Sequence, residues 1–169
     1  LITSNPDNLD VFAVTSVSEG GVASVRLTRD GGDSFEQLAA EFELWGVTVP
    51  IFSGIGPLIM SQGVGMLFSF DQGMTWFLQN QGLEGLETDG LFSELVDFVS
   101  PPQRSLPVVA SRDSIFSFSP GGWEEMAGPG AEIRALAVRR AVSGGGEELL
   151  LAATDQGVWS IPTTDLGGS

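Results

Sequence analysis

The sequence predicts an all-β fold made of about four repeated units, each a sheet of four short antiparallel strands. Four strand-like segments that end in a small hydroxyl residue recur along the chain, and the anchoring residues are spaced by 41, 48 and 43 positions. These anchors are Thr28, Ser69, Ser117 and Ser160. The 169 residues also include 23 Gly and 9 Pro, which divide a chain that is 42% hydrophobic into short apolar runs separated by turns.

A repeat of roughly 40–50 residues is typical of one four-stranded blade of a β-propeller. The prediction is therefore a single domain over residues 1–169, with blades at approximately 1–40, 47–80, 91–127 and 132–162. The expected strands are, in order, 11–15, 22–28 and 34–38; 47–52, 58–61, 66–70 and 76–79; 94–99, 108–111, 115–118 and 123–126; and 133–139, 149–153 and 158–161.

The two end blades are each one strand short in this interpretation. The first has no obvious first strand and the last has no fourth, and residues 1–3 are expected to supply one missing strand by ring closure. Three arrangements stay open: a compact four-bladed ring, a fragment of a larger ring, and a partial ring that a partner completes. An open arc would leave sheet edges exposed, which proteins avoid unless something covers them.

Two of the anchors begin the same motif, S/T-x-D-x-G-x-S/T-aromatic, at residues 28–35 and 69–76. A third copy at 117–123 is degenerate, with Ser119 in place of the Asp, and the fourth has lost the motif. The motif resembles the Asp-box (BNR) repeat of sialidase-like and photosystem-assembly-factor-like β-propellers. The residues that carry the resemblance are Thr28, Asp30, Gly32, Ser34 and Phe35; Ser69, Asp71, Gly73, Thr75 and Trp76; and Ser117, Gly121 and Trp123.

The resemblance implies that each box is a structural turn between the third and fourth strands of a blade. The Asp accepts hydrogen bonds from N–H groups inside the turn, the Gly adopts a positive φ, and the aromatic residue packs back onto the blade. In the family these turns lie on the rim, away from the central axis where ligands bind. No metal site is expected, because Asp30 and Asp33 supply too few of the 6–8 oxygens that Ca²⁺ requires.

The composition excludes several kinds of chemistry within this chain. It contains no His, Cys, Tyr or Lys, so imidazole or thiol catalysis, Schiff-base chemistry, and haem or pigment ligation by His are all absent. No cofactor is expected. The net charge of −15 disfavours binding to nucleic acid phosphates or anionic lipids. The longest apolar stretch, around residues 47–60, is broken by Pro and Gly, so no transmembrane segment is predicted.

The resemblance makes glycoside hydrolysis the enzymatic alternative. Sialidases of this fold use a Tyr nucleophile, which this chain lacks, whereas other glycosidases of the fold use two carboxylates about 5–10 Å apart. Asp97 and Glu94, in a predicted innermost strand, are the candidate pair. A sugar-binding propeller is a further alternative, with Trp45 and Trp159 as the candidate aromatics. The pairs Glu124-Glu125 and Glu147-Glu148 are interpreted as solvated charges at strand ends or turns.

The preferred hypothesis is a non-enzymatic interaction or scaffold protein. It would be an extrinsic accessory or assembly subunit that docks through protein partners on a larger complex, with membrane and photosynthetic complexes as the examples that the resemblance implies. Arg134, Arg139 and Arg140 form the basic cluster proposed for docking, and strand alternation predicts Arg134 and Arg140 on one face and Arg139 on the other. The chain opens at Leu1, as it would after removal of a signal peptide or in a fragment; an extracytoplasmic, periplasmic or secreted location is expected.

Overall fold

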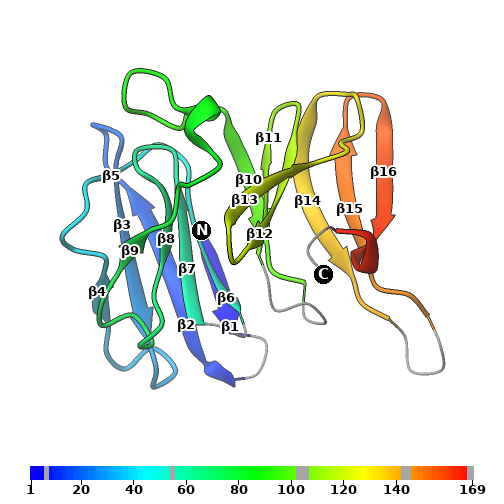
Figure 1. Cartoon of the computed structure of the whole chain (residues 1–169). Coiled ribbons are helices and arrows are strands. Elements are labelled where there is room, and N and C mark those ends of the chain that lie inside the picture. The colour runs from blue at the N-terminus through cyan, green and yellow to red at the C-terminus, as the bar shows by residue number, and fades with distance from the viewer. Residues whose placement is uncertain (6–7, 54–55, 102–106, 142–145, 167–169) are drawn as a thin grey trace. The chain divides into compact units, whose positions relative to one another are not determined.

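The structure is a computed structural model that describes all residues except 6–7, 54–55, 102–106, 142–145 and 167–169 (Figure 1). The described residues form an all-β fold with four antiparallel sheets. They divide into two compact units, the first comprising residues 1–79 and 87–93 and the second residues 80–86 and 94–169. Each unit contains two of the sheets. The part of the chain that the structure describes contains no helix long and apolar enough to cross a bilayer.

The first sheet has the strand order β1-β2-β3-β4, with the short β5 also paired to β3. Its strands are β1 (Ile2–Asn5), β2 (Asn8–Val17), β3 (Val22–Thr28), β4 (Glu36–Leu38) and β5 (Leu44–Trp45). Residues 1–3 supply a missing strand, as predicted, but not by ring closure: Ile2 lies opposite Val14, and β1 is the first strand of this sheet. The segment was hard to recognise because it is short, polar and without alternation.

The second sheet packs against the first within the same unit. Its strands, in order, are β6 (Thr48–Ser53), β7 (Gly56–Ser61), β8 (Gly65–Phe68) and β9 (Phe77–Leu78). One hydrophobic cluster spans both sheets, with Val25, Leu27 and Leu38 from the first sheet against Ile59 and Leu67 from the second. All four residues of β8 are buried, so this third strand is covered on both faces.

The second unit repeats this arrangement. Its strands are β10 (Leu95–Val99), β11 (Val108–Ser111), β12 (Ile115–Ser119) and β13 (Gly122–Met126) in the third sheet, and β14 (Ile133–Arg139), β15 (Leu149–Thr154) and β16 (Gly157–Pro162) in the fourth. Two short 3-10 turns, η1 (Glu84–Leu86) and η2 (Thr163–Asp165), belong to the same unit. The core joins Val108, Ala110 and Ile115 of the third sheet to Leu136 and Leu150 of the fourth.

The strands β10 and β14 each contain an irregularity that the sequence did not predict. The pairing register shifts between Leu95 and Asp97 and again between Ile133 and Ala135. Such an extra residue interrupts the in–out alternation of side chains. In β14 the buried positions are consequently Ile133 and Leu136, three residues apart instead of two.

A hydroxyl side chain closes the hairpin between the second and third strands in all four sheets. Each of these oxygens accepts a hydrogen bond from a backbone N–H two to four residues later, at 3.1 to 3.2 Å. The four residues are Ser18, Ser61, Ser111 and Thr154. This local bond competes with continuation of the strand and favours a turn. The signal is visible in the sequence as a second series of hydroxyl residues, which the sequence-based predictions did not include.

Candidate functional site

The turn at residues 28–35, which we call the first box, is held by a network centred on Asp30. The Thr28 and Ser34 hydroxyls donate to the two carboxylate oxygens at 2.7 and 2.5 Å, and the Ser34 N–H donates at 2.9 Å. The Thr28 oxygen in turn accepts from the Gly32 N–H at 2.9 Å. The hydroxyl of Ser34, followed by that of Thr28, holds the pKa of Asp30 well below its usual range. A carboxylate committed to these bonds acts as a structural acceptor within the turn.

The second box repeats the network around Asp71. Its carboxylate accepts from the Ser69 hydroxyl at 2.9 Å and from the Thr75 N–H and hydroxyl at 2.8 and 2.6 Å. The Thr75 hydroxyl is the main cause of the lowered pKa of Asp71. The aromatic residues differ between the boxes. Trp76 is buried and donates its indole N–H to the Gly73 carbonyl at 3.0 Å, whereas Phe35 is 47% exposed and makes an edge contact with Phe12.

The third repeat closes its hairpin without a box. Ser119 and Gly122 pair directly, and the Ser119 hydroxyl accepts from the Gly121 N–H at 3.1 Å. Trp123, the second residue of β13, makes an edge contact with Phe118. The Ser117 hydroxyl, which would bind the missing Asp, donates instead to the Leu166 carbonyl at 2.9 Å. A tight two-residue turn therefore replaces the Asp network here.

The two boxes of the first unit are tied together by Arg29. Its guanidinium forms an ion pair with Glu36 and donates to the Gln72 carbonyl of the second box. Gln72 has φ +61°, at the position where the first box has Gly31 with φ +72°. A left-handed conformation costs a residue with a Cβ about 1–2 kcal/mol, so the second box carries backbone strain that the first avoids.

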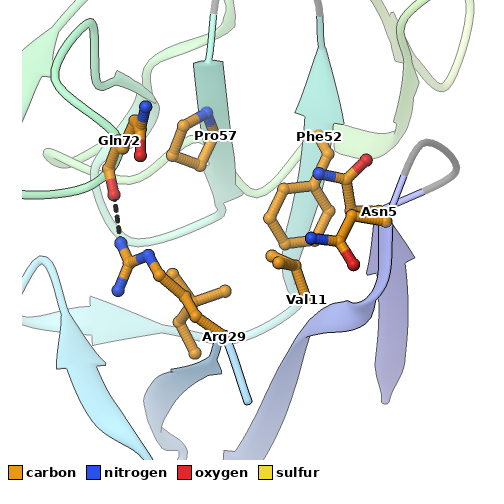
Figure 2. A pocket seen from close by; sticks show the side chains of 8 residues that line it. Asn5, Val11, Arg29, Phe52, Pro57 and Gln72 are labelled. Atoms are coloured by element: carbon orange, nitrogen blue, oxygen red, sulfur yellow. Dashed lines mark hydrogen bonds between the residues drawn. The ribbon is translucent and has the colours of Figure 1, made fainter. Parts of the chain in front are cut away.

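A cavity of about 310 Å³ opens beside this arginine (Figure 2). Among the described residues, four apolar side chains and four polar ones line it: Val11, Leu27, Phe52 and Pro57, and Asn5, Asn8, Arg29 and Gln72. None of these eight side chains is a carboxylic acid, an alcohol or a thiol. They offer amide and guanidinium hydrogen bonds, but no acid, base or nucleophile for catalysis.

The structure gives the candidate carboxylates Asp97 and Glu94 different surroundings. Asp97 lies in β10, and its two oxygens accept from the backbone N–H groups of Phe98 and Leu136, each at 2.8 Å. It thus joins β10 to β14. Glu94 precedes β10 and pairs with Arg112, 3.4 Å from Nε to Oε2, across an open hollow of about 780 Å³ that Asp97 does not line. The geometry does not bring these carboxylates into one cavity.

The candidate sugar-binding aromatics also occupy different surroundings. Trp159 packs against the core of the second unit, while Trp45 in β5 is 37% exposed in the first unit. Within the described residues, no group of three or more acidic side chains could hold a metal ion.

One acidic residue departs from the sequence-based interpretation. Glu148 was expected to be solvated but is only 3% exposed, and it accepts a hydrogen bond from the buried Thr163 hydroxyl at 3.1 Å. Its own carbonyl accepts from the Thr163 N–H at 3.0 Å, so this residue anchors η2.

The three docking candidates Arg134, Arg139 and Arg140 are all exposed. No carboxylate among the described residues lies within ion-pair distance of them. The predicted alternation is wrong. The register shift at Arg134 interrupts the alternation along β14, and Arg140 lies beyond the end of the strand.

Arg139 lies on the face of the fourth sheet that points away from the core of the second unit. We call this surface of the fourth sheet the free face. It consists of three cross-strand rows: Ala135, Ala153 and Val158; Ala137, Leu151 and Ser160; and Arg139, Leu149 and Pro162. All nine residues are exposed or half-buried, and Val158 is 74% exposed. The opposite face of the same sheet, with Leu136, Leu150 and Ala152, packs in the core.

The comparisons with known proteins add no identification. No protein-family model matches the chain, and no curated protein matches it significantly. The Asp-box assignment therefore rests on the motif and its hydrogen bonds, and it stays a prediction.

Proposed function

We propose that this chain is a non-enzymatic interaction protein whose four sheets are blades of an Asp-box propeller. It docks, as an accessory or assembly subunit, on a larger protein complex outside the cytoplasm. The observation that carries the proposal is the free face of the fourth sheet: a mostly aliphatic sheet surface bordered by Arg139, which has no ion-pair partner among the described residues.

The composition of the free face supports a protein partner. A contiguous exposed apolar surface rimmed by polar groups is typical of an interaction site. The row of Ala137, Leu151 and Ser160 has short, uncharged side chains, which permit close approach of another sheet. Arg139 is well suited to the rim of such a contact, because its guanidinium can bind a carboxylate with two parallel hydrogen bonds.

The surroundings of the carboxylates also favour binding over catalysis. Asp97 accepts two backbone hydrogen bonds and Glu94 is paired with Arg112. A glycosidase needs two carboxyl groups that face the same sugar. These two residues are instead engaged in holding strands and turns of the third and fourth sheets.

The test uses native extracts and a charge reversal on the free face. We expect the wild-type chain to elute, by light scattering, in a species larger than its own 17.8 kDa, together with constant companion proteins. The exposed substitutions Arg139→Glu and Ala137→Glu should remove those companions. Arg26→Glu, on an exposed arginine of the first sheet, is the matched control and should retain them. A wild-type species of 17.8 kDa, or equal loss with the control, would contradict the proposal.

A further inference from the structure

We infer that the open edge of β16 is a binding site for an extended strand of a partner protein, which completes the fourth sheet. This inference rests on the proposed docking function and names the kind of contact that it uses. The first three sheets each contain a strand beyond the third, namely β4, β9 and β13. Among the described residues the fourth sheet ends at β16, the strand that carries the fourth anchor, Ser160.

The backbone of β16 presents unpaired groups along this edge. Thr154 and Gly157 close a two-residue turn, so they form a hydrogen-bonded pair, and such pairs alternate with non-hydrogen-bonded ones along an antiparallel ladder. Trp159 and Ile161 therefore bond to β15. The N–H and C=O groups of Val158 and Ser160 point away from it, and no hydrogen bond to them occurs within the described residues.

The side chains of β16 also distinguish it from the other outermost strands. Proteins protect open edges by making them short or by placing charges on them. β4 has three residues including Glu36, β9 has two residues, and β13 carries Glu124 and Glu125. β16 has six residues, no charge, and a Val158 that is 74% exposed. It has the properties of a strand that is normally paired.

The burial of the third strands in other sheets also indicates that β16 is normally paired. β8 and β12 occupy the third position in their sheets; every residue of β8 and all but one of β12 are buried. No residue of β16 reaches that degree of burial. A strand added to β16 would bond to Val158 and Ser160 and cover part of this exposed surface, as β13 does for β12.

The charge of the chain favours a strand from a different protein as the occupant. β1 is not available, because it pairs with β2 in the first sheet. Two copies of this chain would each bring a net charge of −15, and their mutual repulsion opposes pairing of one β16 with another. A partner segment of at least four extended residues, neutral or basic, avoids this repulsion. Strand addition of this kind draws its affinity from main-chain hydrogen bonds.

A peptide copied from the fourth strand of the third sheet provides the probe. Residues 121–128 are synthesised with both glutamates replaced by threonine, which removes the negative charge and favours an extended conformation. The full chain is titrated with this peptide, and backbone amide hydrogen exchange is followed residue by residue. We expect slower exchange at Val158 and Ser160, with little change at Trp159 and Ile161.

Two proline variants separate loss of the edge from loss of the fold. Val158→Pro removes an N–H that faces the edge, so the sheet should stay folded while peptide affinity falls at least tenfold. Trp159→Pro removes a ladder bond to β15 and should disrupt the hairpin. Three results would each overturn the inference. One is slow amide hydrogen exchange at Val158 and Ser160 in the free monomer, and another is a dimer in which β16 is protected from exchange. The third is peptide binding that Val158→Pro leaves unchanged. Arg139→Glu should leave peptide binding intact. Failure of strand addition at β16 is therefore distinguishable from failure of the proposed docking function.

Discussion

Substituting Gly82 with alanine should destabilise the second unit far more than a matched glycine substitution elsewhere. Gly82 lies where the segment before η1 runs beside β13, and the Trp123 N–H donates to the Gln81 carbonyl at 2.8 Å. A Cβ at residue 82 would lie 2.8 Å from the Trp123 carbonyl carbon and closer still to its oxygen. Both obstacles are backbone atoms, which no rotamer change can move.

The destabilisation expected for Gly82→Ala is the sum of three contributions. Gly82 has φ +95°, and a positive φ costs an alanine about 1–2 kcal/mol. Relief of the clash by movement of the backbone costs about 1–3 kcal/mol. Loss of the hydrogen bond between Trp123 and Gln81 costs about 1 kcal/mol. Gly90 is the control, because it has φ +78° but open space around its Cβ, so Gly90→Ala should cost only the conformational part.

The assay is urea unfolding of both variants, followed by far-UV circular dichroism and tryptophan fluorescence. We expect the free energy of unfolding of Gly82→Ala to lie about 2–4 kcal/mol below that of Gly90→Ala, from the clash and the lost hydrogen bond together. Equal destabilisation by the two substitutions would show that the segment before η1 does not pack against β13 in solution.

Three further predictions concern the boxes and the carboxylates. Gln72→Gly should stabilise the chain by about 1 kcal/mol because it relieves the positive φ, while Gly31→Gln should destabilise it by a similar amount in thermal unfolding. The lowered pKa values of Asp30 and Asp71 mean that their stabilisation is complete above about pH 4 and is lost as the pH falls through their folded values. As the pH is lowered from 7 to 2, the urea midpoint of unfolding should therefore fall less steeply in the Asp30→Asn/Asp71→Asn variant than in the wild-type chain. Asp97→Ala should lower the free energy of unfolding by about 1–3 kcal/mol, because the N–H of the buried Leu136 loses its acceptor. Glu94→Ala should lower it by less than about 1 kcal/mol, because the ion pair of Glu94 is exposed. Hydrolysis of an aryl glycoside by the wild-type chain that Asp97→Asn abolishes would instead indicate a catalytic role.

The repeat could be predicted because its signals are local. The hydroxyl anchors, the Asp and the Gly of each box lie within eight residues of each other, and their hydrogen bonds form within the same turn. All the main strands of the four sheets fall within the four expected repeat ranges, apart from the short β5. Local patterns of this kind require no knowledge of the distant chain.

The features that sequence reasoning missed depend on distant partners. The register shift at Arg134 arises in the pairing of β14 with β15, and it changes which arginines share a face. Glu148 is buried because Thr163, fifteen residues away, folds over it. Asp97 is positioned by the N–H of Leu136, on another sheet. None of these partners can be identified from residue type or spacing alone.

The two series of turn hydroxyls have a practical consequence for protein engineering. Ser18, Ser61, Ser111 and Thr154 close the same hairpin in every sheet, whereas the Asp network occurs in only two of the third-to-fourth-strand connections. The third sheet forms that connection with a bare two-residue turn. The chain thus already tolerates different lengths and chemistries at this connection. A fluorophore loop, an affinity tag or a new pair of termini should therefore be introduced at residues 120–121, and not at the hairpins that every sheet closes in the same way.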